Sequence, residues 1–286
     1  MAKKKKNIIE KIIDTSKVDE QVRVFPNKVG SYGFDAWGFN MKDMKNSMRF
    51  AKFLYEQFYK VEAFGLENIP REGRCLIIAN HSGQLPFDGM LIGYAMLSNP
   101  NGPRAPKAMM ERFLPTVPFI GNWLNSMGAV VGDMLNAERM LENEEAIIVF
   151  PEGVRGSNKV YKDKYKLQRF GNGFMHLAMK HKTPIIPVSV VGMEETIRSY
   201  ADIKPLAKLL GMPVAPLVIP WIFPSKVVLH FGTPMYFDND VHKEHDIKYR
   251  VDLVKDEINN LMQSGLTHRK QAAVQQKISS KEKTKS

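Results

Sequence analysis

The sequence has very little cysteine and lacks a long apolar run, and each absence excludes a class of protein. Among 286 residues there is one cysteine, Cys75, which excludes an intramolecular disulfide framework and a multi-cysteine zinc or iron–sulfur site. The amino terminus has the basic flank of a secretory signal, but Glu10 and Lys11 interrupt the apolar stretch that such a signal needs. We therefore expect a cytoplasmic protein.

Two windows without charged residues, 113–132 and 209–225, are the candidates for contact with a membrane. Both contain prolines, and the second has four of them, so neither is expected to be a spanning helix, which needs about 20 predominantly apolar residues. The second window is too apolar for a typical exposed loop. Two interpretations stay open: a loop folded over the core, or a shallow insertion that places Trp221 and Phe223 at the lipid interface.

Acidic residues are fewer than basic ones, 30 against 41, which gives a formal charge of +11. Part of the excess lies at the ends, in the run Lys3 to Lys6 and in residues 266–286, which hold six Lys or Arg against Glu282 alone. This tail, rich in Gln, Ser and Lys, is predicted to be disordered. It fits a solubility tail or contact with an anionic membrane. Because no nucleic-acid-binding motif accompanies it, we expect no nucleic-acid partner.

Short β-type runs alternate with helical patterns along the chain, which predicts an α/β fold with a mostly parallel central sheet flanked by helices. We divide the chain into a basic N-terminus and helical segment (1–60), a single α/β domain (61–240), a C-terminal helix (241–265) and the basic tail (266–286). The apolar stripe of the first segment covers Met41–Tyr59. The predicted strands are Cys75–Ala79, Lys107–Met110, Ala129–Val131, Ala146–Phe150, Ile185–Val191 and Lys226–Phe231, and the helices between them include Gly89–Ser98, Asn136–Asn143 and Gly173–Lys180.

The first chemical motif follows the strand Cys75–Ala79. Asn80 and His81 stand at its carboxyl end, and Asp88 opens the next helical pattern after a Gly-containing loop. Open α/β sheets place their sites at this edge. A neutral imidazole can take a proton from a hydroxyl while a carboxylate holds its other nitrogen, so His81 and Asp88 are the candidate catalytic pair. The alternative is a histidine satisfied by a backbone carbonyl and an aspartate that caps the helix.

The second motif lies in the turn after the predicted strand Ala146–Phe150, where Glu152, Gly153 and Arg155 follow one another closely. Arg155 offers a planar fork of donors for a phosphate or carboxylate, and Gly153 permits close approach of the backbone. The alternative is a structural ion pair between Glu152 and Arg155. A third strand end, at the run Ile185–Val191, contains Pro187, which predicts irregular pairing there.

In this order and spacing the motifs resemble those of the glycerolipid and lysophospholipid acyltransferase superfamily. That family carries Asn-His-x4-Asp after a strand, then Phe-Pro-Glu-Gly-x-Arg, then a Pro-rich strand. Asn80-His81, Phe150–Arg155 and Pro184–Val188 supply the three blocks, and the resemblance covers roughly Val61–Asp238. It implies a single acyltransferase domain that moves a fatty acyl group to a hydroxyl of a glycerolipid or lysophospholipid, such as 1-acylglycerol-3-phosphate.

The resemblance also implies roles for the motif residues. His81, oriented by Asp88, would be the general base, and no cofactor or metal would be needed, because acyl-CoA or acyl carrier protein is a co-substrate that is already activated. Substrate would be bound by Asn80, Glu152, Gly153 and Arg155. The absence of a Gly-x-Ser-x-Gly motif and the mid-strand position of Cys75 fit direct transfer without an acyl-enzyme. We expect such a protein to associate peripherally with a membrane.

The sequence departs from the family pattern in two places. Six residues instead of four separate His81 from Asp88, a spacing similar to that of the monoacylglycerol and diacylglycerol acyltransferase-like branch. In the block Gly-x-Ile-x-x-x-Arg, Met134 replaces the basic residue. A phosphorylated acceptor would then need Arg112, Lys107 or Arg155. The donor's phosphates have candidate partners in a basic run that is otherwise a solvated loop, formed by Lys162, Lys164, Lys166 and Arg169.

Two other functions remain possible at this point. A non-catalytic lipid-binding protein of the membrane surface would keep the same fold and use His81 and Asp88 only as loop anchors. A metal-dependent hydrolase would use the same two residues as ligands, but the chain has no His-Glu-x-x-His motif. The nearest pattern, His242 with His245, is more typical of a solvated helix start.

Overall fold

The computed structural model describes residues 32–82, 85–116, 120–203, 205, 208, 216–218, 221–238 and 244–283. These residues form a seven-stranded sheet with the order β1-β9-β6-β2-β5-β3-β4. The five strands from β6 to β4 are parallel to one another, whereas β9 is antiparallel to β6 and parallel to β1. The strands are β1 (Glu62–Phe64), β2 (Cys75–Ala79), β3 (Lys107–Met110), β4 (Ala129–Val131), β5 (Ala146–Val149), β6 (Ile185–Val191) and β9 (Val228–Phe231). The predicted fold class is confirmed.

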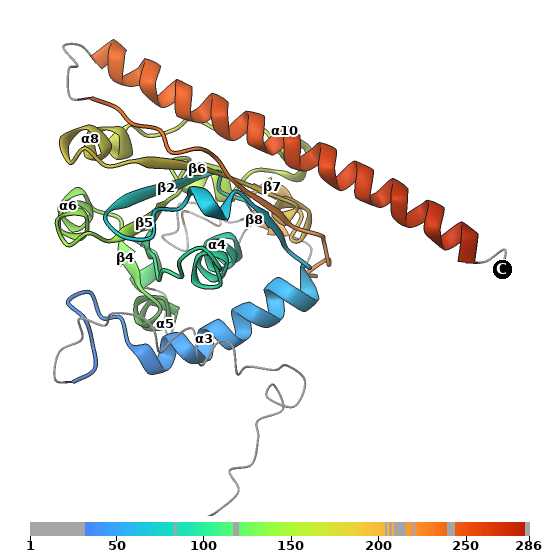
Figure 1. Cartoon of the computed structure of the whole chain (residues 1–286), viewed down its shortest axis with the longest axis horizontal. Coiled ribbons are helices and arrows are strands. Elements are labelled where there is room, and N and C mark those ends of the chain that lie inside the picture. Colours follow the sequence, from blue (N-terminus) through green and yellow to red (C-terminus); the bar gives the residue numbers. More distant parts are fainter. Residues whose placement is uncertain are drawn as a thin grey trace, which may run out of the picture.

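Helices cover both faces of the sheet (Figure 1). The helices α3 (Met41–Phe53) and α4 (Phe87–Leu97) pack on one face, and α6 (Met134–Glu142), α8 (Gly173–Lys180) and α10 (Glu244–Lys283) pack on the other. The central strand β2 explains the arrangement, because all its residues are buried and successive side chains point to opposite faces. Ile77 joins the core of α3 and α4, whereas Ile78 joins the core of α6, α8 and α10.

The structure confirms the predicted strands and contains further elements that were not predicted. The N-terminal helix begins where the Asn40 side chain accepts the backbone N–H groups of Lys42 and Asp43, and it ends in a π-helical turn at Leu54–Phe58. Pro187 pairs regularly with β2, but on its other side the pairing shifts from Val188 with Phe231 to Ile185 with Met235. The elements that the periodicity did not predict include β1, α5 (Ile120–Ser126), α7 (Val154–Ser157) and the hairpin of β7 (Ser199–Asp202) with β8 (Pro216–Val218).

The prediction of a disordered tail over 266–286 was wrong as far as Lys283, because α10 continues to that residue. The helix of 40 residues is about 60 Å long, and its end extends well beyond the rest of the molecule (Figure 1). Two contacts hold its middle on the domain. His268 Nε2 lies 2.6 Å from Glu62, and Arg269 donates two hydrogen bonds to Glu195. His268 and Arg269 of the tail thus bind acidic residues of the domain, which the composition of the tail did not reveal.

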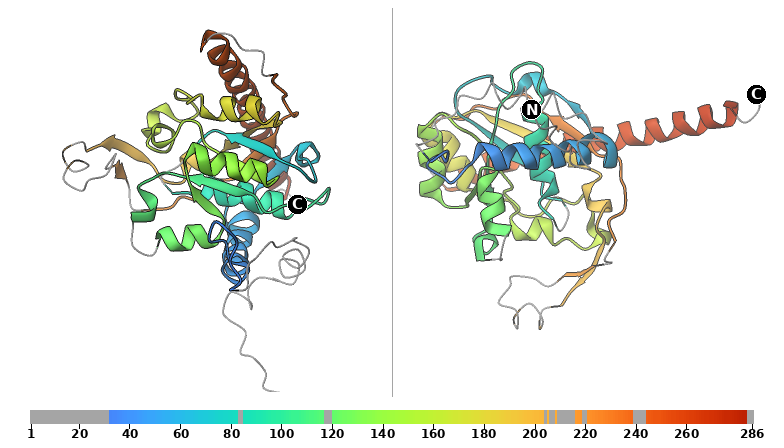
Figure 2. Two further views of the ribbon diagram at one scale, coloured as in Figure 1. Left: turned by 90° about the vertical axis from the view of Figure 1, so that its left-hand side faces the viewer. Right: turned by 90° about the horizontal axis from the view of Figure 1, so that it is seen from below.

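Several predictions concern residues outside the described ones: the run Lys3 to Lys6, His242, and residues 209–215, 219 and 220 of the window 209–225. Within the described part of the chain, no helix combines the length and the hydropathy that crossing a bilayer requires. The hairpin β7–β8 follows β6 and extends away from the body of the domain in both views of Figure 2.

Candidate active site

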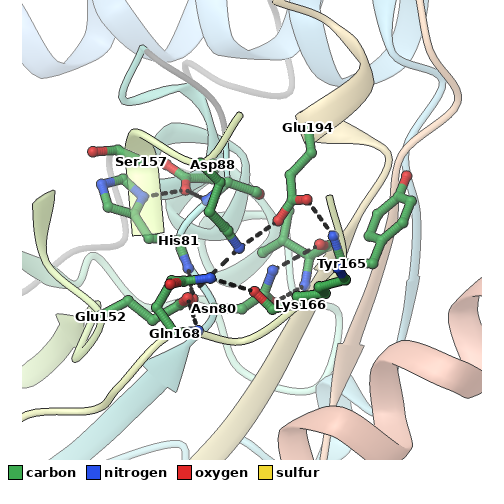
Figure 3. A network of polar contacts seen from close by, with 12 residues as sticks. Asn80, His81, Asp88, Glu152, Ser157, Tyr165, Lys166, Gln168 and Glu194 are labelled. Carbon is green, nitrogen blue, oxygen red and sulfur yellow. Dashed lines mark hydrogen bonds and ion pairs between the residues drawn. The ribbon is translucent and has the colours of Figure 1, made fainter. Parts of the chain in front are cut away.

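An imidazole and a carboxylate meet at the carboxyl end of β2. His81 lies two residues beyond Ala79, the last residue of this strand, and Asp88 lies in the first turn of α4. His81 Nδ1 is 2.6 Å from Asp88 Oδ2 (Figure 3). The same oxygen also accepts the N–H of Ser82 at 2.9 Å, so Asp88 binds both the ring of His81 and the backbone of the next residue. The N-cap of α4 is Pro86. Asp88 Oδ1 accepts the N–H of Gly89 in the first turn at 2.8 Å, while Oδ2 contacts the imidazole.

The surroundings of His81 favour the pairing. Burial alone lowers the pKa of His81, but the charge of Asp88 and its hydrogen bond to the ring outweigh burial and raise it. The ring stacks on Phe150 at 4.4 Å between centroids and 25° between planes. Because Asp88 takes Nδ1, the second nitrogen, Nε2, is the one left for a ligand.

Glu152 supports the backbone of this histidine. Its side chain is buried, and one oxygen accepts the N–H of His81 at 3.0 Å while the other accepts the N–H of Gln168 at 2.6 Å. The carboxylate therefore joins the loops that follow β2 and β5. The ion pair between Glu152 and Arg155, considered above as an alternative, is not formed: the partner of Glu152 among the described residues is Lys159, at 3.5 Å.

Asn80 also holds backbone at this edge. Its side-chain amide donates to the carbonyl of Val190 at 3.1 Å and accepts the N–H of the same residue at 2.7 Å. The two bonds fix the end of β2 to β6 in a fully buried position. The structure thus brings Asn80 and Glu152 to the site as supports of its loops, with their polar atoms already engaged.

Gly153 and Arg155 lie at the amino end of α7 (Val154–Ser157). Gly153 has φ 56° and ψ −148°, and a Cβ there would come within 3.0 Å of Glu111 Oε1, so the turn requires glycine. Gly153 lines the cavity described next. Arg155 is exposed, and it is not among the described residues that form the cavity wall.

A cavity of about 900 Å³ opens beside His81 and Asp88. Its volume lies in the range of small-molecule sites, roughly 300–1,000 Å³. The wall is dominated by flexible apolar side chains, which suit a hydrocarbon chain of variable shape. These are Met44, Met48, Met90, Met109, Met110, Phe113, Met127, Met134, Phe150 and Phe174.

The basic residues considered as substitutes at the position of Met134 differ in their surroundings. Lys107 is buried, forms an ion pair with Asp35 and lies over the ring of Phe39 at 4.5 Å. Arg112 lines the cavity, is largely exposed and contacts Asp133 at 3.1 Å. Arg112 is therefore the one of the three that faces the cavity. In the basic run, Lys162, Lys166 and Arg169 are exposed, and Lys164 lies over the ring of Tyr161.

The two residues proposed for lipid contact have different surroundings. The side chain of Trp221 is 65% exposed. Phe223 is half-buried: its N–H binds the carbonyl of Thr196 at 2.8 Å, and the guanidinium of Arg198 lies 4.4 Å from the centre of its ring.

Sequence reasoning missed Lys159 and Glu194, which form a buried pair at 2.7 Å behind Glu152 (Figure 3 labels Glu194). Neither residue belongs to a recognisable motif. The one available signal was their place near the carboxyl ends of β5 and β6, next to residues already selected.

The chain is similar to several known proteins. Residues 60–191 match the family model described as Acyltransferase. An uncharacterized protein of Mycobacterium tuberculosis is 35% identical over 219 residues, which are 72% of this chain and 61% of the relative. The human "DGAT1/2-independent enzyme synthesizing storage lipids" is 26% identical over 189 residues, 64% of this chain and 56% of that protein. The chain thus spans less than two thirds of the length of these relatives.

A solved structure shares the fold. The crystal structure of the 1-acyl-sn-glycerophosphate (LPA) acyltransferase PlsC from Thermotoga maritima superposes with a TM-score of 0.54. The two chains are 22% identical, and the match covers 86% of this chain and 88% of the other.

The packing behind His81 generates a prediction about Gly156. An added Cβ would come within 2.8 Å of His81 Cβ and 2.7 Å of Glu152 Cβ. Because such overpacking forces the loops apart, we expect Gly156→Ala to lower the free energy of unfolding by about 1–3 kcal/mol, measured by urea denaturation. The matched control is Gly171→Ala, whose Cβ would meet its nearest atom at 3.7 Å. Equal stability of the two variants would contradict the packing described here.

Proposed function

Since the chain belongs to the glycerolipid acyltransferase superfamily, we propose that it is an O-acyltransferase. It moves a fatty acyl group from the thioester of acyl-CoA or acyl carrier protein to a hydroxyl of a glycerolipid or lysophospholipid. The observation that carries this proposal is the contact between His81 Nδ1 and Asp88 Oδ2, at 2.6 Å, in the wall of an apolar cavity. A base and a compartment for hydrocarbon stand side by side, as acyl transfer between lipids requires.

In the proposed mechanism the neutral imidazole acts through Nε2. This nitrogen removes the proton of the acceptor hydroxyl as the oxygen attacks the thioester carbonyl. The imidazolium that forms is stabilised by the carboxylate of Asp88 on Nδ1. When the C–S bond breaks, the thiolate of the donor leaves and takes up the proton from Nε2, which restores the neutral base.

The burial and the thiol pKa of Cys75 support transfer of the acyl group directly from donor to acceptor. Cys75 is fully buried in β2, and burial raises the pKa of its thiol to about 11. A thiol with such a pKa is almost entirely protonated at neutral pH and is a poor nucleophile. The thioester of the donor is already activated, so the reaction needs no acyl-enzyme intermediate.

The residues at the open side of the cavity would select the class of acceptor. Arg112 offers a guanidinium there for a phosphate, although Asp133 competes for it at 3.1 Å. A phosphorylated acceptor such as 1-acylglycerol-3-phosphate would have to displace this pair, whereas a monoacylglycerol would leave it intact. A product screen by mass spectrometry, with lysophosphatidate, other lysophospholipids and monoacylglycerol as acceptors, distinguishes the two classes.

The assignment of the base generates a prediction for His81→Ala. We expect the rate of acyl transfer to fall by about 10²–10⁴-fold, as is usual when a general base is removed, while the protein stays folded by circular dichroism. The matched control is His176→Ala, which changes an exposed histidine on α8. Near-normal turnover of folded His81→Ala would refute this mechanism. A wild-type protein that binds lipid but transfers no acyl group from any thioester would instead be a non-catalytic lipid-binding protein.

We further propose that the protein docks on a membrane surface through the described strands of the hairpin β7–β8 and residues 221–223 after it. Exposed apolar side chains gather here: Tyr200, Leu217 and Ile222 are 53%, 51% and 42% exposed, in addition to Trp221. Because β7 follows β6, the hairpin leaves the same edge of the sheet as the loops of His81 and Glu152. Lipid chains could then pass from the bilayer to the cavity without crossing water. Phe223, held by Arg198, supports this segment from within.

The double variant Trp221→Ser with Ile222→Ser tests the docking surface. Each replacement removes an apolar side chain that would be buried in lipid and so weakens binding. We expect affinity for vesicles containing anionic lipid to fall about tenfold or more. Flotation of vesicles with bound protein measures it. The matched control is Tyr236→Ser, an equally exposed aromatic residue next to Met235, which pairs with the opposite end of β6. Unchanged binding of the double variant would refute the docking surface.

A further inference from the structure

A buried lysine lies behind the candidate active site. Lys159 Nζ is 2.7 Å from Glu194 Oε1 and 3.5 Å from Glu152 Oε2. The exposed fractions of the three side chains are 5%, 5% and 0%. A buried ammonium group is costly unless it is paired and hydrogen-bonded. Lys159 is paired with two carboxylates in a loop that contacts the site, so we ask what function its charge has there.

Glu152 links the pair of Lys159 and Glu194 to the candidate base, His81. Glu152, which Lys159 contacts, accepts the N–H of His81 through its other oxygen. Glu194 lies in the short turn Met193–Glu195 after β6 and also accepts the N–H of Tyr165 (Figure 3). The ammonium group thus sits where the loops following β2, β5 and β6 converge.

The charges around His81 make this position sensitive. Asp88 on α4 and Glu152 after β5 raise the pKa of His81, whereas Lys159 lowers it. The cavity wall adds the charged residues Glu111, Arg112 and Asp133. Glu152 accepts two backbone N–H groups, which hold its carboxylate in place beside Lys159. Without Lys159, its negative charge would act on the imidazole without compensation.

We propose that Lys159 is a positioning residue that keeps His81 ready to accept a proton, by neutralising the buried carboxylate of Glu152 that holds the His81 peptide. Glu194 binds the same ammonium group at 2.7 Å and fixes it in place. The consequence for acyl transfer rests on the proposed function. The effect on the titration of the imidazole does not, because it is a property of the folded protein alone.

The double variant Lys159→Met with Glu194→Gln removes the buried pair together, so that neither partner is left as an unpaired charge. We expect the pKa of His81 to rise by about one unit, measured by NMR titration of the histidine ring signals, with the His81 signal assigned by its loss in His81→Gln. The matched control is Glu194→Gln alone, which retains Lys159 beside Glu152 and is expected to leave the pKa of His81 unchanged or slightly lowered. Lys180→Met, which breaks an exposed pair with Glu138, should have no effect.

A folded double variant in which His81 titrates as in the wild type, or at lower pH, would overturn the proposal. If the double variant does not fold, Glu194→Gln decides, since an upward shift in that variant would contradict the role given to Lys159. Where acyl transfer is active, the acid limb of the kcat profile should move upward with the pKa of His81 in the double variant, with KM changed less than kcat. A protein without transferase activity that still shows the upward shift would refute the proposed function and leave the role of Lys159 standing.

Discussion

Two buried carboxylates hold one histidine, and the rest of the site depends on this arrangement. Asp88 binds a ring nitrogen of His81 and Glu152 binds its peptide nitrogen. An ionised carboxylate in a protein interior is stable only when hydrogen bonds and counter-charges replace its water. This requirement explains why Asp88 also accepts the N–H of Ser82, why Gln168 turns its N–H inward, and why the turn of Gly156 packs against the carboxylate of Glu152 without room for a side chain.

The sheet provides the place where these requirements can be met. Its parallel strands β2, β5 and β6 end at one edge, and the loops after them supply the imidazole, the supporting carboxylate and the buried cation from distant parts of the sequence. Asn80 fixes two of these strand ends to each other. Methionine and phenylalanine side chains from α3, α4, α6 and α8 border a cavity next to the histidine. A polar site and an apolar compartment therefore share a wall.

Much of this architecture could be predicted from sequence, because buried strands and strand-end motifs leave local signals. The strand Cys75–Ala79 and the pairing of His81 with Asp88 are examples. The direction of a side chain leaves no such signal. Asn80 and Glu152 were expected to bind substrate, yet their polar atoms are engaged by backbone groups 110 and 71 residues away along the chain. Lys159 escaped notice for the same reason, and the helical tail depends on distant partners of Arg269.

The central claim is that Asp88 fixes one tautomer of His81 and leaves Nε2 free for the acceptor hydroxyl. Nitrogen-15 NMR of the histidine rings, at a pH above the titration of His81, tests it most directly. The account predicts a neutral ring with its proton on Nδ1, since the Asp88 carboxylate accepts a hydrogen bond there. A proton located on Nε2 would contradict the account, because that nitrogen could not then remove a proton from any substrate.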